Sequence, residues 1–400
     1  MQLSEIIFIF APIIATLNMK KSHLSFAVML MGSTLLTGCL DSDNNNDNPI
    51  VTEYVVTHGA LIVNNGSSYS GIDGSLTCLD YYDGTARQNV FKNANGMSLG
   101  GTPNAVLVYG DKVYVAGSDE NAVFVLNKKT FKLIERISTT DEMGEEEGVT
   151  PRYLTSYKSN VYVSTYGGYV GVIDTLSLSV HNMYKVGSYP EGMAIGTKDD
   201  VPFLYVANSD YGFGNGSISI INLLSGAVSE FKDGQIHYPQ ELAVAGDYIY
   251  VLDWGYYDEN WVQKEAGVYL INGSSVQKII PDATGMAVAG NIILTFNAPY
   301  NSDKQTTYSV FNIAAGTLNP FILSDDSSNP IFSPAAISID PNTGYVLIAS
   351  RTKNEDTGYP DYAAPGFVNM YTSNGQYVKT LATGVEPHQI AYLYGMAKLQ

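Results

Sequence analysis

The sequence predicts an all-β chain folded as a seven-bladed β-propeller with four-stranded blades. Three observations support this fold class. Short β-rich triplets recur along the chain, a turn that usually contains proline precedes each repeat, and fragments at the two ends add up to one further repeat. Together they predict a single closed ring of small sheets, although 400 residues could otherwise form two or three domains.

The repeated unit is clearest in the stretch from Pro151 to Asp174. A first strand at Tyr153 to Tyr157 ends in a polar turn, and a second strand follows at Val161 to Val163. A Gly/Tyr loop leads to a third strand that ends at Asp174, and a fourth strand lies around Val180 to Val186. Four short strands separated by turn residues are typical of a propeller blade.

The second strand and the turn before the first strand set the register of the repeats. The second-strand triplets are Val113-Tyr114-Val115, Val161-Tyr162-Val163, Leu204-Tyr205-Val206, Ile249-Tyr250-Val251, Ile293-Leu294-Thr295 and Val346-Leu347-Ile348. The turns are marked by Pro103, Pro151, Pro190, Pro239, Thr284, Pro334 and Pro387. These marks lie 39 to 53 residues apart. Most of these spacings are longer than a typical propeller repeat of about 40–45 residues. We expect the surplus residues in loops, where function tends to reside.

Six complete blades therefore run from about Thr102 to Val385, and the two ends of the chain supply a seventh. The predicted strands of this last blade are Gln389 to Tyr394 from the C-terminal end and Ala60 to Val63, Leu76 to Asp80 and Ala86 to Phe91 from the N-terminal end. Closing the ring in this way removes exposed sheet edges. Residues 54–400 are thus predicted to form one propeller domain.

The N-terminal segment has the pattern of a bacterial lipoprotein signal. Lys20 and Lys21 precede a short apolar run, and the sequence from Leu36 to Cys39 reads L-T-G-C, which resembles a lipobox. We expect residues 1–38 to be a signal segment whose true start is Met19, with Cys39 as the lipidated residue. The alternative is an ordinary secretory signal followed by an unrelated cysteine.

Residues 39–53 are predicted to be a flexible acidic tether. The stretch L-D-S-D-N-N-N-D-N has no apolar face to bury. An acidic stretch directly after the lipidated cysteine resembles the export signal of Bacteroidetes surface lipoproteins. We therefore expect an outer-membrane protein, held by its lipid anchor only, that faces the cell exterior. An ordinary polar linker is the alternative.

The net charge and the numbers of cysteine and tyrosine residues favour some classes of function over others. The formal net charge is −18, which disfavours binding to nucleic acid phosphates. With Cys39 used for lipid, only Cys78 remains, so no intrachain disulfide is expected and Cys78 is predicted to be a small core residue. The 30 tyrosines occur partly in strands, where aromatic residues pack well, and partly in particular loops.

In a propeller, the turn into the first strand and the loop between the second and third strands open on the same face. The long loops of this second kind are Asn64 to Gly74, Asn208 to Gly216, Asp253 to Gly267, Asn297 to Thr307 and Ser350 to Gly366. The turns on the opposite face are mostly short. Because Trp, Tyr and Arg dominate binding hot spots, these loops predict a ligand-binding face.

The main binding candidates come from the loop that holds both tryptophans: Trp254, Tyr256, Tyr257 and Trp261. Further candidates from neighbouring blades are Tyr69, Tyr166, Tyr169, Tyr211, Phe213, Tyr300, Arg351, Tyr359 and Tyr362. Their flat rings could stack on a macrocycle, a nucleobase or a sugar. The alternative is that some of these rings only pack the loops down.

Nearer the axis, the residues after each marked turn should form a polar ring at the channel mouth. They are Asn104, Arg152, Glu191, Gln240, Gly285, Ala335 and His388. Of these, Arg152, Glu191, Gln240 and His388 are binding candidates. Arg152 and Glu191 could simply pair with each other, and His388 could be a metal ligand or an ordinary hydrogen-bonding residue.

No catalytic constellation is present, so we predict a protein that is not an enzyme. The sequence contains no HExxH, G-x-S-x-G or P-loop motif, and we expect no catalytic residue, no bound metal and no cofactor. A propeller lactonase or lyase would need carboxylates converging in the channel, for which Glu191 alone is weak support. Such an enzyme remains an alternative.

The blade units P-R-Y-L…N-V-Y-V-S-T-Y-G-G-Y-V-G-V-I-D-T and Y-P-E-G-M-A-I…F-L-Y-V-A-N-S resemble those of YncE-type propellers. More narrowly, the chain from about Ala60 to Tyr394 is similar to DUF5074-type lipoproteins of Bacteroidetes, which include the BtuG-type cobalamin-binding proteins. This resemblance implies a surface protein that captures cobalamin or another corrinoid and passes it to a TonB-dependent outer-membrane transporter resembling BtuB. No ligand motif transfers residue by residue.

Two function classes therefore follow from the sequence. The first is a monomeric, non-catalytic capture protein for a corrinoid, which the aromatic face would suit. The second is an enzyme at the channel mouth. Surface glycan binding shares the aromatic face with the first class and remains open.

Overall fold

The computed structural model describes residues 53–299, 305–324 and 329–398. The predicted signal segment, Cys39, most of the tether and Tyr300 lie outside the described residues. Within the described ranges, no helix has the length and hydropathy needed to cross a bilayer.

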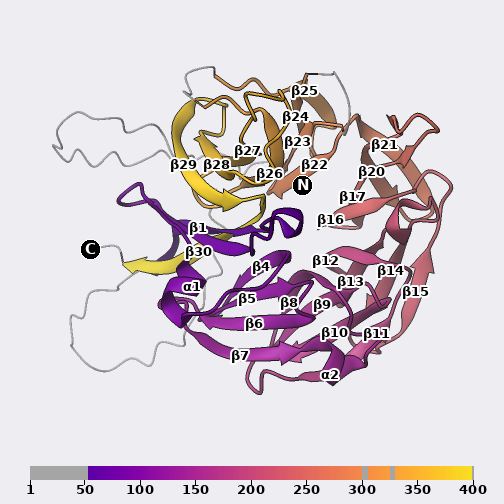
Figure 1. Cartoon of the computed structure of the whole chain (residues 1–400). Coiled ribbons are helices and arrows are strands. Elements are labelled where there is room, and N and C mark those ends of the chain that lie inside the picture. The colour runs from indigo at the N-terminus through magenta and orange to yellow at the C-terminus, as the bar shows by residue number, and fades with distance from the viewer. Residues whose placement is uncertain (1–52, 300–304, 325–328, 399–400) are drawn as a thin grey trace, which may run out of the picture. The chain divides into compact units, whose positions relative to one another are not determined.

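Seven four-stranded antiparallel sheets stand in a ring, as in a seven-bladed β-propeller (Figure 1). Blades one to three consist of β4 (Pro103–Tyr109), β5 (Lys112–Gly117), β6 (Ala122–Asn127), β7 (Leu133–Ser138); β8 (Pro151–Tyr157), β9 (Asn160–Thr165), β10 (Tyr169–Asp174), β11 (Val180–Lys185); and β12 (Pro190–Lys198), β13 (Val201–Asn208), β14 (Ser217–Asn222), β15 (Val228–Phe231). Blades four to six consist of β16 (Pro239–Ala245), β17 (Tyr248–Asp253), β20 (Gly267–Asn272), β21 (Ser275–Pro281); β22 (Gly285–Ala289), β23 (Ile292–Asn297), β24 (Thr307–Asn312), β25 (Thr317–Pro320); and β26 (Ser333–Ile339), β27 (Val346–Arg351), β28 (Pro365–Tyr371), β29 (Tyr377–Val385).

The seventh blade joins both ends of the chain, as predicted. Its sheet order is β3–β2–β1–β30, with β30 (Pro387–Lys398) innermost, then β1 (Glu53–Asn64), β2 (Ser75–Asp80) and β3 (Ala86–Arg87). Figure 1 shows indigo β1 beside yellow β30. The predicted strand at Ala86 to Phe91 is wrong beyond Arg87. The strand ends at Arg87, and helix α1 (Val90–Asn95) begins at Val90. Gly96 ends that helix with a left-handed backbone, φ 70°.

A few short elements lie in the loops, outside the blade sheets. They are the helix α2 (Thr139–Met143), the 3-10 turns η1 (Ser68–Ser70) and η2 (Asp210–Gly212), and a small hairpin of β18 (Tyr256–Tyr257) and β19 (Gln263–Lys264).

The core consists of seven apolar clusters, one between each pair of neighbouring blades. Strand β1 illustrates the arrangement, because successive side chains point to opposite sheet faces. Leu61 and Val63 pack against blade one, whereas Ala60 and Ile62 pack against blade six. Burial on both faces explains why the second strands are nearly continuous apolar runs. Cys78 lies in one of these clusters, buried and free, as predicted.

The marked turns produce a β-bulge at the start of most inner strands. The ladder skips a position after each of Pro103, Pro151, Pro190, Pro239, Pro334 and Pro387, and the skipped positions include Asn104, Arg152, Glu191, Gln240, Ala335 and His388. Blade five, which has Thr284 in place of proline, keeps a regular register. Because bulges re-aim side chains, these positions are the ones at which the sequence predicts residues at the channel mouth.

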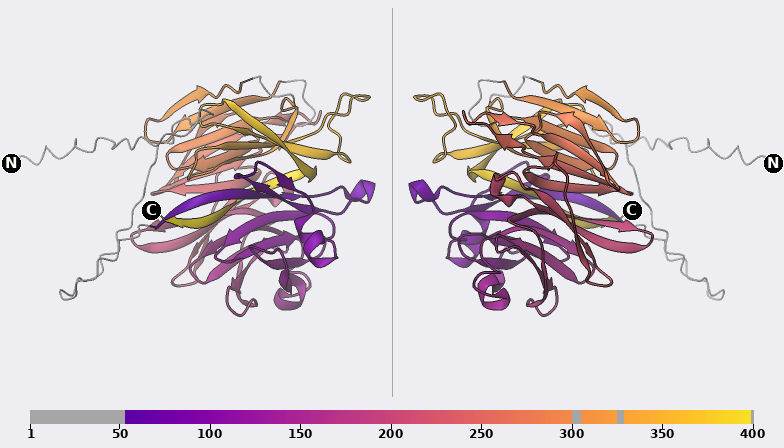
Figure 2. Two further views of the ribbon diagram at one scale, coloured as in Figure 1. Left: turned by 90° about the vertical axis from the view of Figure 1, so that its left-hand side faces the viewer. Right: turned by 90° about the vertical axis from the view of Figure 1, so that its right-hand side faces the viewer.

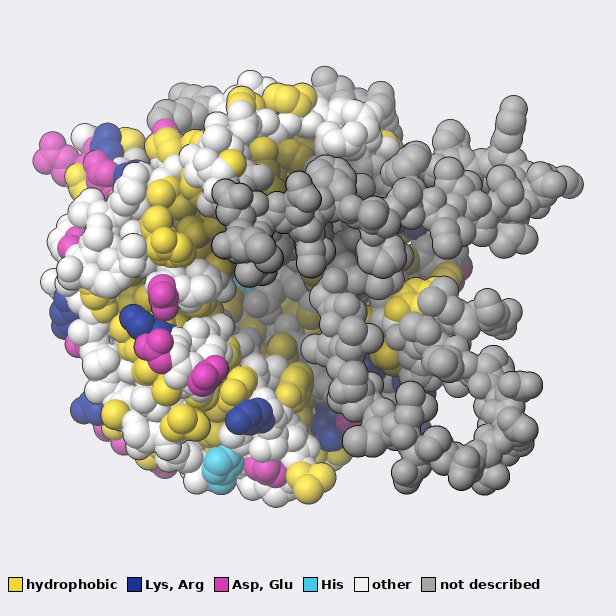
Figure 3. Space-filling model, turned by 180° about the vertical axis from the view of Figure 1, so that it is seen from behind, with side chains coloured by type: hydrophobic (Ala, Val, Ile, Leu, Met, Phe, Trp, Pro, Cys, Tyr) yellow, Lys and Arg dark blue, Asp and Glu magenta, His cyan; other side chains and the backbone are white. Residues whose placement is uncertain are grey.

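The two faces of the propeller differ in character. The long loops after β1 and β27 project from one face, called the loop face below (Figure 2). The β1–β30 ladder runs from Asn64 and Pro387 at the loop face to Glu53 and Lys398 at the other end. In Figure 3, the visible part of the opposite face shows charges of both signs scattered among other side chains.

Closure of the ring predicts a large stability difference between two positions in β1. Leu61 is fully buried, whereas Val55 is 50% exposed. We expect Leu61→Ala to lower the free energy of unfolding by about 2–5 kcal/mol and Val55→Ala by less than about 1 kcal/mol. Urea denaturation followed by circular dichroism measures both. Equal effects would contradict the closure described here.

Candidate functional site

The loop face brings most of the predicted binding residues into two groups. The first, the cavity group, consists of Trp254, Tyr257, Arg351, Tyr359, Tyr362 and His388. The second, the tyrosine cluster, consists of Tyr166, Tyr189, Tyr211 and Phe213. The predicted single aromatic face is therefore divided into a hollow and a more exposed cluster.

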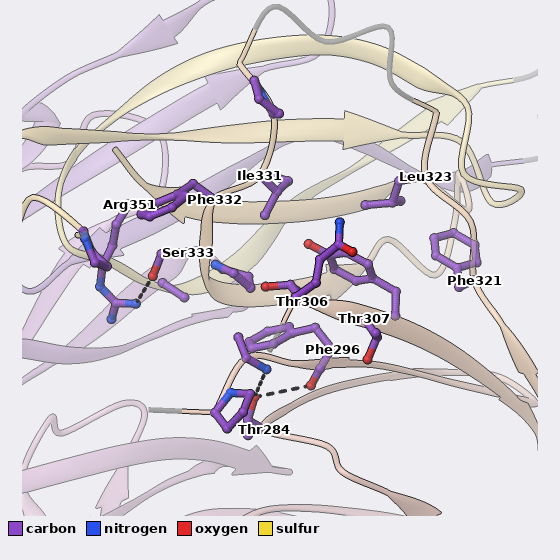
Figure 4. A pocket seen from close by; sticks show the side chains of 18 of the residues that line it. Thr284, Phe296, Thr306, Thr307, Phe321, Leu323, Ile331, Phe332, Ser333 and Arg351 are labelled. Atoms are coloured by element: carbon purple, nitrogen blue, oxygen red, sulfur yellow. Dashed lines mark hydrogen bonds between the residues drawn. The ribbon is translucent and has the colours of Figure 1, made fainter. Parts of the chain in front are cut away.

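The cavity group lines a cavity of about 1580 Å³ beside blades five and six. Figure 4 shows apolar side chains around it, among them Phe296, Phe321 and Ile331, with Arg351 and Ser333 at one side. The hydroxyls and amides of its wall include those of Gln263, Gln305 and Thr307. The described lining residues include no Asp or Glu, although the whole chain is strongly acidic. The described wall thus combines aromatic and aliphatic surface with hydroxyl and amide groups.

Trp254 is fixed at the edge of this cavity by hydrogen bonds and ring packing. Its indole Nε1 donates to the carbonyl of Thr284 at 3.0 Å, and its ring packs edge-on against Tyr238 at 5.6 Å. The preceding residue, Asp253, accepts from the backbone N–H groups of His237, Tyr238 and Gly255. Burial raises the pKa of Asp253 to about 7. The buried carboxyl therefore ties the tryptophan loop to the turn into blade four.

Arg351 is held by an ion pair and lies across an aromatic ring. Its Nε donates to both carboxylate oxygens of Glu386, at 2.8 and 2.7 Å, and its Nη1 donates to Ser333 at 3.3 Å. The guanidinium carbon lies 5.5 Å from the centre of the Tyr362 ring. Both Tyr359 and Tyr362 remain accessible, with 72% and 50% exposure. These two rings form the outer rim of the cavity.

Two polar atoms among the cavity-lining residues are buried without a hydrogen-bond partner in the described part of the chain. They are Oε1 of Gln263 and the hydroxyl of Tyr308. Buried polar groups in native proteins are nearly always paired with protein, water or ligand. Five further atoms of this kind, on Asn65, Tyr81, Tyr114, Asn208 and Tyr392, lie outside the cavity wall, so this feature is not particular to the cavity.

His388 reaches the cavity from the bulge at the start of β30. Burial, followed by the nearby guanidinium groups of Arg152 and Arg351, lowers the pKa of His388 to about 3. The ring is therefore neutral near pH 7. It makes no hydrogen bond or ion pair with any residue that the structure describes.

The tyrosine cluster stands on a buried ion pair between blades two and three. Arg152 Nε donates to Glu191 at 2.8 Å, as the sequence analysis had allowed, and Tyr166 donates its hydroxyl to the same carboxylate. Burial disfavours the charged guanidinium and by itself would lower the pKa of Arg152. The negative charge of Glu191 acts in the opposite direction, and the pKa of Arg152 is raised. Burial and the Glu191 charge raise the pKa of Tyr166, which stays a donor. Both partners of Glu191 lie on blade two, so the contact fastens the two blades together.

Above this pair, the rings are progressively more exposed. Tyr166 packs edge-on against Tyr189 at 5.1 Å, and Tyr211 lies 5.1 Å from Tyr189. Tyr211 and Phe213 are 55% and 73% exposed. Tyr211 has φ 51°, an uncommon conformation for a bulky residue that is often found at functional sites.

Sequence reasoning missed two aromatic residues of the site, Tyr189 and Tyr238. Tyr238 packs against Trp254, and a Cβ on Gly212 would lie 2.8 Å from the Tyr238 ring. Tyr238 therefore connects the cavity group with the tyrosine cluster. A signal was present, because each of these tyrosines directly precedes a marker proline, Pro190 or Pro239, on the loop face.

Five described candidates join neither group directly. Tyr256 packs edge-on against His237, and Trp261, 69% exposed, lies 6.5 Å from Tyr257. Gln240 is buried and donates to the carbonyl of Pro239. Tyr69 is fully exposed in η1, and Tyr169 begins β10. For Tyr69 and Tyr169 the structure shows no ring contact with the other candidates.

The described residues contain no cluster of three or more His, Cys, Asp or Glu side chains able to hold a metal ion. In the channel, Glu191 is engaged by Arg152 and Tyr166, as described above. Glu241, on β16, is the other notable channel carboxyl, and burial raises its pKa to about 7.

Comparisons with known proteins bear on the fold alone. No protein-family model matches this sequence, and no curated protein matches it. Among solved structures, one match is Kuenenia stuttgartiensis hydrazine synthase, with 15% sequence identity and a TM-score of 0.50. The match covers 68% of this chain and 76% of the hydrazine synthase chain. The WD40 repeats of RRP9 match over 70% and 81%, with 9% identity and a TM-score of 0.50. The chain is thus a seven-bladed β-propeller.

Burial of Glu241 predicts a pH-dependent stability. Because its folded pKa of about 7 exceeds the ordinary value of 4.5, the folded state holds a proton between these values that the unfolded state has lost. The variant Glu241→Gln lacks this titrating group. The free energy of unfolding of the wild type, measured relative to that of Glu241→Gln, therefore falls as pH rises from about 4.5 to about 7, by at most about 3 kcal/mol.

Urea denaturation of both proteins at pH 4.5, 6 and 8 measures this difference. Glu145→Gln, at an exposed position, is the matched control and should show much less pH dependence. A constant difference between wild type and Glu241→Gln across this range would refute the predicted burial.

Proposed function

We propose that this chain is a non-catalytic capture protein that binds a corrinoid in the cavity beside blades five and six. The observation that carries the proposal is the cavity itself, about 1580 Å³ in volume and lined by aromatic and aliphatic side chains together with polar ones. Pockets for drug-sized ligands usually measure about 300–1,000 Å³. A cavity of this size suits a larger ligand, and the resemblance of the blade repeats to BtuG-type proteins suggests which one.

The chemistry of the wall also favours a large, uncharged and partly planar ligand. Tyr359 and Tyr362 can offer ring faces to a macrocycle, and their hydroxyls can give orientation. The side chains of Gln305, Thr306 and Thr307 also line the cavity, and amide arms around a corrin ring could bond to them. The lack of carboxylates in the described wall disfavours a cationic ligand.

Strand β1 carries the chain from the first described residue to the loop face. The described chain begins at Glu53, and 12-residue β1 then runs to the loop face. At about 3.3 Å per residue, this strand places its first residue roughly 36 Å from the loop face. In this proposal Cys39 carries the lipid anchor, and a TonB-dependent transporter receives the ligand from the cavity.

Glycan binding is the second candidate, and one observation favours it. Tyr211, Phe213 and Trp261 expose most of their rings outside the cavity, and exposed rings can stack on sugars. A propeller enzyme gains less support, because Glu191 already accepts from Arg152 and Tyr166. We assign Glu191 a structural role in joining blades.

The proposal predicts that the rim tyrosines contribute strongly to affinity. We expect the double variant Tyr359→Ala/Tyr362→Ala to bind cyanocobalamin at least about tenfold more weakly than wild type, because it loses two accessible ring faces. Tyr82→Ala, a 75% exposed ring beside His58 near the opposite face, should bind normally. Isothermal titration calorimetry measures all three proteins.

Failure of the wild type to retain cyanocobalamin through gel filtration, with no calorimetric signal, would refute corrinoid capture. A glycan array probed with the same protein separates the second candidate. Glycan binding lost in Tyr211→Ala but kept in the rim double variant would favour the tyrosine cluster as a sugar platform.

A further inference from the structure

We propose that His388 binds the metal at the centre of the captured macrocycle as an axial ligand. This inference rests on the proposed function and deepens it, because it assigns a coordinate bond to one side chain. A corrin ring carries cobalt with exchangeable positions above and below the ring plane. A histidine in the wall of the cavity could occupy one of them.

The position of His388 in the fold supports this role. The residue follows Pro387 in a β-bulge: Val63 pairs with Gln389 and Asn64 with Pro387, so the β1–β30 ladder passes over His388. Such bulges re-aim a side chain while the flanking strand stays rigid. The bulge thus presents the imidazole to both the channel mouth and the cavity. Metal sites held by strands are positioned more precisely than those on loops.

The lone pair of the imidazole is not used by the protein. No hydrogen bond or ion pair joins the His388 imidazole to a residue that the structure describes. The nearest strong charges are the guanidinium groups of Arg152 and Arg351, and each already pairs with a carboxylate, Glu191 or Glu386. A neutral imidazole with a free nitrogen is the form that coordinates metals.

The other loop-face histidine offers a useful contrast. The His237 ring lies 5.3 Å from Tyr256, edge-on, and is not part of the cavity wall. The two imidazoles share a face of the propeller but differ in access to the cavity. His237 is therefore a matched control.

The proposed step is a ligand exchange without redox change. In aquacobalamin, the Co(III)–OH₂ bond breaks and water leaves with its electron pair. The nitrogen lone pair of His388 then forms a Co(III)–N bond. Cyanocobalamin has a firmly held cyanide at the same position and cannot make this exchange readily. The two compounds thus separate coordination from binding of the macrocycle.

The test titrates aquacobalamin and cyanocobalamin into wild type, His388→Gln and His237→Gln, using calorimetry and visible absorption. We expect His388→Gln to bind aquacobalamin at least about tenfold more weakly, while its affinity for cyanocobalamin changes less than about threefold. Aquacobalamin bound to wild type or His237→Gln should show a shifted visible spectrum. The spectrum of aquacobalamin with His388→Gln should match that of the free compound.

An unshifted spectrum of aquacobalamin bound to wild type would overturn the assignment of His388 and leave corrinoid capture standing. Equal losses for both cobalamins in His388→Gln, without a spectral difference, would also overturn it. If wild type binds neither cobalamin, the proposed function itself fails, and this inference fails with it.

Discussion

Pairing of β1 with β30 is the constraint on which the rest of the structure depends. This ladder joins Glu53 to Lys398 at one end and Asn64 to Pro387 at the other, and so closes a ring whose strands come from opposite ends of the chain. Without it, blades one and six would each lose an apolar partner. Closure gives every sheet two packed faces, and a ring packed in this way is a rigid support for loops.

The same closure arranges the candidate site. Bulges follow the marker prolines at the start of the inner strands, and the long loops after β1 and β27 project from the same face. Charge pairs then fix the parts that a ligand would meet: Arg152 with Glu191 beneath the tyrosine cluster, and Arg351 with Glu386 beside the cavity. Both pairs use the acidic partner to hold an arginine in place. The site is therefore preorganised, which lowers the ordering cost of binding.

Local sequence patterns predict this fold well because each blade repeats the same pattern of short apolar strands separated by turn residues. The apolar triplets locate the second strands, and the marker prolines locate the start of the inner strands with their bulges. The strand predicted after Arg87 fails because Asn89, at φ 53°, turns the chain and Gly96 caps a helix. The division of the aromatic face depends on long-range packing, such as Tyr238 between Trp254 and Gly212, which periodicity cannot show. Tyr189 and Tyr238 were within reach of the sequence, because both precede marker prolines.

The most direct test of the central claim is a crystal structure of the protein with cyanocobalamin bound. The account predicts density for the corrin ring inside the cavity beside blades five and six, with Tyr359 and Tyr362 at its rim. Density over the tyrosine cluster alone, on the opposite face, or nowhere on the protein would contradict the claim that the closed ring shapes this cavity for a corrinoid.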